Sequence, residues 1–366
     1  MIRLLSRASA IGVICLTLAP ASARESSDEA TRTAARALPF GVSPSAASAA
    51  FRAELALRWA PIHHQDVNQQ GRHALGGTAD YLRSYDFDGD GESRNNWENA
   101  ADPRHSLAAH VYFSVVETRT HWFVSYLFFH PRDWSSTFFE TEHENDAEGV
   151  LFALERDGSR HGTLRAAVTV AHRDFYSYVP AGSSWRSGRE DIDGTLSLQP
   201  LAGEMHAVTA QQAEGHGLKA WPYYAIKGDG VVYYPSLEVA EAPSGPNDRH
   251  VLYRLRDVLE PGGLWDSRHD PRLFAGYGVF AGNSSNGCGS GAFLCRDDAA
   301  HTMWAWDDHN DGSARGALAS DPAALVASYF DIPEAVAGDY SFNPFRERRQ
   351  LVAFKPRREQ GNGARY

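Results

Sequence analysis

Four side chains that bind metal ions or exchange protons lie within a 16-residue window: Asp133, His143, Asp146 and Glu148. Asp146 and Glu148 are two residues apart at the start of an apolar stretch, so in a β-strand both carboxylates face the same side. Asp133 ends the preceding apolar stretch, so its carboxylate can reach the same point. Three carboxylates and one imidazole at one end of a sheet repel each other unless a cation neutralises them. The pattern therefore predicts a divalent-cation site.

The composition of this window also indicates which ion it would bind. Hard divalent cations take oxygen ligands and retain several waters. A single imidazole among carboxylates therefore favours Ca²⁺ or Mg²⁺ over Mn²⁺, and over a closed Zn²⁺ site. However, Glu140, Glu142 and Glu144 lie in the same stretch, which is also typical of a solvated acidic turn. The residues alone leave both interpretations open.

A second candidate metal loop is formed by Asp86, Asp88 and Asp90, which alternate along the chain and precede Gly91. Alternating carboxylates before a glycine are typical of the start of a calcium loop. The twelfth position of an EF-hand loop would be Trp97 instead of a glutamate. That departure argues against an EF-hand. A solvated turn is the favoured interpretation, and a free-standing calcium turn is the alternative.

Two histidines, His172 and His216, sit where predicted strands give way to polar loops, which makes them candidates to line the site. Either one is also a candidate general base, should the cation activate water in a hydrolase. The chain has no Gly-x-Ser-x-Gly motif, no Walker loop and no Rossmann glycine run. The sequence therefore leaves open whether the protein is an enzyme and favours a non-catalytic role.

The segments that would position these residues are mostly strand-like. Residues 110–116 and 121–129 are rich in β-branched and aromatic side chains and are separated by four polar residues, which predicts a hairpin. The second of these strands is apolar on both faces, so we expect it to lie centrally in a sheet that is covered on both sides.

Other segments complete a mainly β fold. Ser43, Pro44 and apolar residues at helical spacing predict a helix over 44–59, and a second short helix is expected over 320–330. We expect further strands at 149–155, 163–171, 205–209, 231–234 and 250–255. Short strands with Gly, Pro and Asp turns predict a β-sandwich of antiparallel strands with a few short peripheral helices.

The N-terminus indicates export. Residues 1–23 have a basic start, a short apolar core and a small-x-small end, as in a signal peptide. We expect a secreted protein, extracellular or periplasmic, with a disordered leader at 24–42, one β-sandwich domain at 43–345 and a basic tail at 346–366. No later segment is expected to span a membrane.

Charge and cysteine content add predictions about the protein's partners and its disulfide bonds. The chain has 35 basic and 46 acidic residues and a net charge of −11, which disfavours nucleic acid as a partner because phosphate binding needs clustered Lys and Arg. In an exported chain, Cys288 and Cys295 are close enough in sequence to predict one disulfide; two free thiols are the alternative.

Part of the chain resembles the secreted necrosis- and ethylene-inducing-like proteins. That family has a Pro-Lys-Asp turn followed by the heptapeptide Gly-His-Arg-His-Asp-Trp-Glu. This chain has Pro-Arg-Asp at 131–133 and Glu-His-Glu-Asn-Asp-Ala-Glu at 142–148, so the heptapeptide matches at its first His, its Asp and its Glu only. His172 falls on a further family position. The flanking sequences resemble vacuolar-sorting-type relatives of that fold, through Trp-Ala-Pro at 59–61 and Gly-His at 215–216.

The resemblance implies a role for the 16-residue segment from Asp133 to Glu148. In the family the matching positions surround a bound Ca²⁺ or Mg²⁺, which supports Asp133, His143, Asp146 and Glu148 as metal ligands here. It implies binding of a cell-surface sugar or lipid headgroup through the metal, with membrane damage and virulence as further expectations. A metal-dependent hydrolase of phosphoesters or glycans is the alternative, and a non-catalytic exported structural protein is a third.

Overall fold

The computed structural model describes residues 47–137, 141–283 and 295–346. All of these residues belong to one unit of the chain, which spans 44–366. The predicted signal peptide (1–23), the leader (24–42) and nearly all of the basic tail (346–366) lie outside the described residues. So does Cys288, and its pairing with Cys295 stays a prediction, as do the domain boundaries at 43 and 345.

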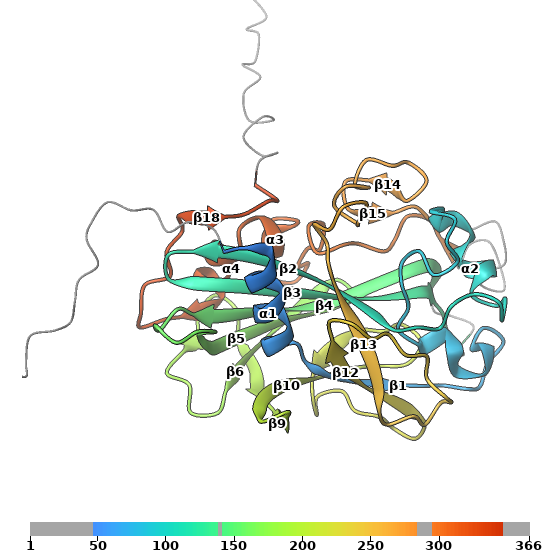
Figure 1. Cartoon of the computed structure of the whole chain (residues 1–366), viewed down its shortest axis with the longest axis horizontal. Coiled ribbons are helices and arrows are strands. Elements are labelled where there is room, and N and C mark those ends of the chain that lie inside the picture. Colours follow the sequence, from blue (N-terminus) through green and yellow to red (C-terminus); the bar gives the residue numbers. More distant parts are fainter. Residues whose placement is uncertain (1–46, 138–140, 284–294, 347–366) are drawn as a thin grey trace, which may run out of the picture. The chain divides into compact units, whose positions relative to one another are not determined.

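Most of the described strands belong to one large sheet, whose long central strands are β2, β3 and β4 (Figure 1). In chain order its fourteen strands are β1 (Ile62–Asp66), β2 (His110–Thr118), β3 (His121–Asp133), β4 (Glu142–Glu155), β5 (Thr163–Ala171), β6 (Asp174–Pro180), β8 (Ile192–Leu196), β9 (Leu198–Leu201), β10 (Glu204–Gln211), β11 (Leu218–Ala220), β12 (Gly230–Ser236), β13 (Val251–Asp257), β16 (Cys295–Arg296) and β18 (Tyr340–Phe342). Two small two-stranded sheets join β14 (Phe274–Gly276) to β15 (Val279–Phe280) and β17 (Phe330–Asp331) to β7 (Arg186–Ser187).

The sheet is mixed and curls back on itself. Its order is β11-β10-β1-β12-β13-β2-β3-β4-β5-β6-β8, with β16 paired to β4, β18 to β2 and β9 to β10. Strands β2 to β6 pair antiparallel, whereas β1 with β10, β12 with β13 and β13 with β2 pair parallel. Strand β11, at one end of this order, contacts β4 and β5, so the sheet approaches a closed barrel.

The prediction of a mainly β protein is confirmed, but a sandwich of antiparallel strands does not describe this sheet. The parallel pairs cause the difference. Strand β13 lies beside β2 although well over a hundred residues separate them in the chain. Hydrophobic patterns locate strands one by one and carry no information on which distant strand becomes the neighbour.

The central strands are buried on both faces, as predicted for the second strand of the hairpin. Alternate residues of β2 and β3 enter two different cores. Val111 and Val124 pack with α1 (Ala49–Trp59) and the β10–β13 side of the sheet, whereas Tyr112 and Phe123 pack with α3 (Ala317–Ser320) and α4 (Pro322–Tyr329). Two-sided burial explains why these strands are continuously apolar instead of alternating.

The predicted local elements are largely found. The hairpin of β2 and β3 and the helix expected over 320–330 are both present. The first helix begins at Ala49 with Ser48 as its N-cap, later than the predicted start at 44. The acidic stretch before residue 149 is strand, not turn, because β4 already begins at Glu142.

The remaining helices are short: η1 (Leu75–Asp80), η2 (Ser93–Asn95) and α2 (Asn96–Asn99). They lie in the long connection between β1 and β2. Within the described ranges, no helix has the length and apolar character needed to cross a membrane.

Candidate metal centre

Strand pairing brings together two of the predicted ligands that are ten residues apart. Asp133 ends β3 and His143 stands directly opposite it on β4. His143 Nε2 lies 3.0 Å from Asp133 Oδ2. The connection between the two strands passes through residues 138–140, which are not described, but the register on either side fixes the pair.

An unusual backbone conformation brings Asp146, the third predicted ligand, close to Asp133 and His143. His143 and Asp146 are three residues apart, so a regular pleat would place their side chains on opposite faces of β4. Asn145 stands between them in the left-handed region, with φ 59°, a conformation that asparagine tolerates better than most residues. Its buried side-chain amide donates to the backbone oxygens of Ser93 and Ala281, which holds the irregular turn in place.

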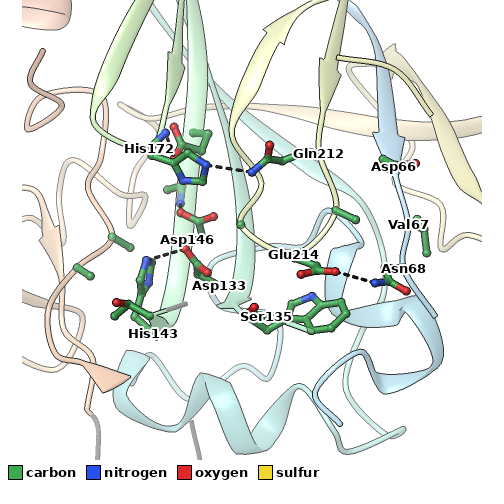
Figure 2. Close-up of a pocket in the computed structure, with 18 of the residues that line it drawn as sticks. Asp66, Val67, Asn68, Asp133, Ser135, His143, Asp146, His172, Gln212 and Glu214 are labelled. Atoms are coloured by element: carbon green, nitrogen blue, oxygen red, sulfur yellow. Dashed lines mark hydrogen bonds and ion pairs between the residues drawn. The ribbon is translucent and has the colours of Figure 1, made fainter. Parts of the chain in front are cut away.

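Asp133, His143 and Asp146 therefore form one group, the Asp133 cluster, in which one ligand atom from each residue lies within 4.8 Å of the others. Figure 2 shows the two carboxylates between His143 and His172, with Gln212, Glu214 and Asn68 on the other side of the pocket. The pocket has a volume of about 1000 Å³, and all of these residues line it. The cluster is thus accessible to a ligand although its side chains are largely buried.

The imidazole of His143 is oriented for metal binding. Its Nδ1 lies 2.7 Å from the backbone oxygen of Asn145, to which it can donate, and this leaves Nε2 directed at Asp133. Metal-binding histidines are commonly held through their other ring nitrogen in this way. Burial on its own would lower the pKa of His143, but the charge of Asp133 and the hydrogen bond to it raise this pKa to about 9.

Glu148 lies in the same pocket but outside the Asp133 cluster. Its Oε1 accepts a hydrogen bond from the backbone N–H of His172 at 2.8 Å. Its Oε2 is buried and has no hydrogen-bond partner in the described structure. Burial, followed by the charge of Asp146, raises the pKa of Glu148 well above its ordinary value.

This unpartnered oxygen tests whether the site fits a cation. A buried acceptor without a partner is costly, and several carboxylates around one pocket repel each other. A divalent ion beside the Asp133 cluster would relieve both penalties, and the ligand set is oxygen-rich as Ca²⁺ and Mg²⁺ prefer. The four residues present therefore fit such an ion.

His216 is fully buried behind the cluster instead of lining the pocket. Its Nδ1 lies 3.1 Å from Asp146 Oδ2, and its Nε2 lies 3.2 Å from Asp80 Oδ1. Burial alone would lower the pKa of His216, but its hydrogen bonds to Asp146 and Asp80 raise this pKa to about 9. Because both ring nitrogens are engaged, His216 is suited to orient Asp146, not to act as a base on a ligand.

His172, the other histidine singled out in the sequence, does line the pocket. Its Nε2 accepts a hydrogen bond from the Gln212 side chain at 3.0 Å, and its φ of 60° lies in the left-handed region. Its backbone N–H donates to Glu148, so the β5–β6 turn is connected directly to the predicted ligand set. Of these two histidines, His172 lies where it could contact a ligand and His216 does not.

Sequence reasoning missed two residues that shape this centre, Asn145 and Asp80. The only signal for Asn145 was its residue type, which tolerates a left-handed backbone. Asp80 is fully buried and accepts hydrogen bonds from the Trp134 indole and the Glu214 backbone as well as from His216. Nothing in its neighbourhood along the chain indicated this role.

The three carboxylates of the second candidate metal loop also lie close together in the structure. Asp86, Asp88 and Asp90, named here the Asp86 loop, place one oxygen each within 4.8 Å of one another. The loop is mostly exposed, and Asn99 and Asn95 donate to Asp88 and Asp90. A third acidic group consists of Glu190, Asp308 and Asp311.

Comparisons with known proteins give a partial resemblance. No protein-family model and no curated protein matches the chain. Among solved structures, one described as a toxin fold for microbial attack and plant defense is 16% identical, with a TM-score of 0.29, and the match covers 58% of this chain and 78% of that chain. The protein NLPPya in complex with mannosamine is 15% identical, with a TM-score of 0.28 and the same coverage. Necrosis and Ethylene inducing Protein 2, from the causal agent of cocoa's witches' broom disease, is 15% identical, with a TM-score of 0.26, over 49% of this chain and 71% of that chain.

The resemblance to the necrosis-inducing family is thus found in the structure as well as in the sequence motifs. At TM-scores this low it neither establishes membership nor assigns a function.

Proposed function

We propose that this protein is a secreted, cation-dependent recognition protein that binds a sugar or lipid headgroup at a cell surface. The observation that carries the proposal is the Asp133 cluster, whose three ligand atoms lie within 4.8 Å of one another in a pocket of about 1000 Å³. The N-terminal pattern of residues 1–23 supports export.

Four residues would hold the ion: Asp133, His143 and Asp146 directly, and Glu148 through its unpartnered oxygen. Ca²⁺ or Mg²⁺ fits this set better than Mn²⁺ or Zn²⁺, because three of the four ligands are carboxylates. A hard cation held by few protein ligands keeps positions for other oxygen atoms, such as hydroxyls of a sugar or oxygens of a headgroup.

The rest of the pocket supports a polar, hydroxyl-bearing ligand. Gln212, Asn68 and Glu214 form the side of the pocket away from His143 (Figure 2). Amide and carboxylate groups of this kind exchange hydrogen bonds with hydroxyls. A volume of about 1000 Å³ would accommodate more than a single sugar ring, as expected for a headgroup.

In this proposal the ion is a recognition element and no bond is broken. Membrane damage would follow from binding at the surface of a target cell. A binding protein needs only a cation site beside a polar pocket, whereas a hydrolase would also need a base. His172, which lines the pocket, is a candidate for this base, and hydrolysis is therefore a testable alternative.

Vesicle and turnover assays separate these functions. Purified protein with Ca²⁺ or Mg²⁺ is tested for binding to, and leakage of, vesicles that carry glycosylated lipids, and in parallel for release of product from phosphodiester and glycoside substrates. The proposal predicts cation-dependent binding that is lost in Asp146→Asn and retained in Asp88→Asn. Turnover that is lost in His172→Gln would contradict it.

A further inference from the structure

The pocket that holds the Asp133 cluster also contains an arginine beside one of the proposed ligands. Arg296 lies on β16, which pairs parallel with β4 so that Arg296 and His143 are register partners. Register partners on adjacent strands direct their side chains to the same face. Arg296 is exposed, lines the pocket and has no ion-pair or hydrogen-bond partner among the described residues.

A second arginine approaches the same part of the pocket. Arg173 directly follows His172 in the β5–β6 turn and also lines the pocket. Its guanidinium donates to the Nε2 atom of His309, and the same Nε2 atom lies 3.2 Å from Asp307 Oδ2, so a carboxylate is close to Arg173 although it forms no ion pair with it among the described residues. Arg173 lines the same pocket as His143 and His301, so its guanidinium and the cation ligands share one pocket.

The pocket combines the proposed cation with two arginines. Its lining also includes carboxylates, among them those of the Asp133 cluster and Asp298, but none of them forms an ion pair with Arg296 among the described residues. The carboxylates of the Asp133 cluster face the proposed ion, whereas the guanidinium of Arg296 keeps its donors for a ligand. An anionic group of the ligand can therefore meet the ion on one side and Arg296 on the other.

We infer that the pocket takes a phosphate-bearing ligand, whose phosphate lies between the cation and Arg296 with Arg173 on its flank. This inference rests on the proposed function, because it needs the cation at the Asp133 cluster. A phosphate offers several oxygens, so it can face a hard cation on one side and a planar guanidinium fork on the other. The polar side of the pocket would then receive the hydroxyls of the group that carries the phosphate.

The phosphate can belong to a soluble sugar phosphate or to a phosphorylated lipid headgroup, and two probes distinguish these sources. Calorimetry with glucose 6-phosphate and with glucose, each in saturating Ca²⁺, tests the soluble form. Co-sedimentation with phosphatidylcholine vesicles, with and without phosphatidylinositol 4-phosphate, tests the lipid form. Preference for either phosphorylated probe supports the inference and identifies the source.

Charge variants locate the phosphate. Arg296→Gln is expected to weaken binding of the phosphorylated probe on the order of tenfold or more, which is typical for loss of a charge-assisted hydrogen bond. Arg296→Lys should recover part of the loss, and Arg173→Gln should weaken binding less. Arg254→Gln is the matched control, since Arg254 is exposed on β13 and does not line the pocket.

Calcium binding alone separates failure of this inference from failure of the proposed function. All arginine variants should still bind Ca²⁺, and those that remove a positive charge from the pocket should bind it no more weakly than the wild type does. If Ca²⁺ binds but neither phosphorylated probe binds better than its neutral counterpart, the phosphate inference is overturned and the cation proposal stands. The same holds if Arg296→Gln behaves like Arg254→Gln. If Ca²⁺ does not bind, both are overturned.

Discussion

The Asp133 cluster and the Asp86 loop each bring three ligand atoms together, but their surroundings differ. Each brings three ligand atoms within 4.8 Å of one another. The Asp133 cluster is largely buried and adjoins Glu148, a buried carboxylate with an unpartnered oxygen. The Asp86 loop is mostly exposed, and its carboxylates accept hydrogen bonds from neighbouring asparagines and from the loop's own backbone.

This difference shows what turns a group of acids into a candidate ion site. In water, clustered carboxylates are screened and hydrated, so their repulsion costs little. In a buried pocket the same repulsion is strong, and burial together with the charge of Asp146 raises the pKa of Glu148. The energetic reason to bind a cation thus exists at the Asp133 cluster and is weak at the Asp86 loop.

The largest effect is expected from removing a ligand of the buried cluster. Asp146→Asn removes a carboxylate charge and should weaken Ca²⁺ binding more than about a hundredfold, beyond what is typical for residues behind the ligands. Asp88→Asn makes the same chemical change in the exposed loop and should leave the affinity nearly unchanged. Isothermal titration of Ca²⁺ and Mg²⁺ measures both variants. Equal losses of Ca²⁺ affinity in the two variants would contradict the difference drawn between the Asp133 cluster and the Asp86 loop.

The chain should also be packed more tightly beside the Asp133 cluster than in the Asp86 loop, so an added methyl group should cost more stability there. Gly149 directly follows Glu148, and an added Cβ there would overlap the backbone oxygen of Tyr126 and the ring of Trp306. Gly149→Ala is therefore expected to lower the free energy of unfolding by about 2–3 kcal/mol, as in overpacked cores. Gly89→Ala in the Asp86 loop meets open space and only a left-handed φ of 81°, so about 1 kcal/mol is expected.

Urea denaturation of the two glycine variants provides the measurement. A cost at Gly89 as large as that at Gly149 would indicate that the β4 segment is not closely packed against Trp306.

A smaller effect on Ca²⁺ binding is expected from substituting His216, which is hydrogen-bonded to Asp146. His216→Ala removes the hydrogen bond to Asp146 and should weaken Ca²⁺ binding about tenfold, the lower end for residues that orient a ligand. His216→Asn should recover part of the affinity, because asparagine keeps a donor and tolerates the left-handed φ of 48°. If both variants change the free energy of unfolding but bind Ca²⁺ as tightly as the wild type, His216 has only a structural role.

The smallest effect concerns His63, a buried histidine whose Nδ1 lies 3.0 Å from the hydroxyl oxygen of Thr209. Burial, followed by the charge of His64, lowers the pKa of His63 to about 3. An unfolded histidine titrates near 6.5, so between about pH 6.5 and 3 the unfolded chain binds a proton that the folded chain does not. Stability contributed by His63 is therefore lost as the pH falls.

The corresponding variant is His63→Asn, whose amide can still meet the Thr209 hydroxyl. Between pH 6.5 and 5.5 its free energy of unfolding should fall by roughly 1 kcal/mol less than that of the wild type. Denaturant titrations at the two pH values test this, and identical pH dependence in both proteins would show that His63 is not buried in its neutral form.

Much of the local structure could be predicted from the sequence. The β2–β3 hairpin has a strong β-branched and aromatic pattern, and its two-sided burial follows from the apolar residues on both faces of β3. The pairing of Asp133 with His143 was also accessible, because both lie at the ends of adjacent apolar stretches.

Other features depend on contacts between distant residues. The position of β13 beside β2 and the hydrogen bond between Asp80 and His216 join segments far apart in the chain. The period-two argument placed Asp146 and Glu148 on one face, but it could not include His143, which reaches the group because Asn145 interrupts the pleat. Such irregularities are set by tertiary contacts and leave little trace in a local pattern.

The most direct test of the central claim is a crystal structure of the protein grown with Ca²⁺. The account predicts one ion bound by Asp133, His143 and Asp146, about 2.3–2.6 Å from the carboxylate oxygens, with the Glu148 side chain turned toward it. An ion bound only at the Asp86 loop, with His143 still hydrogen-bonded to Asp133, would contradict it.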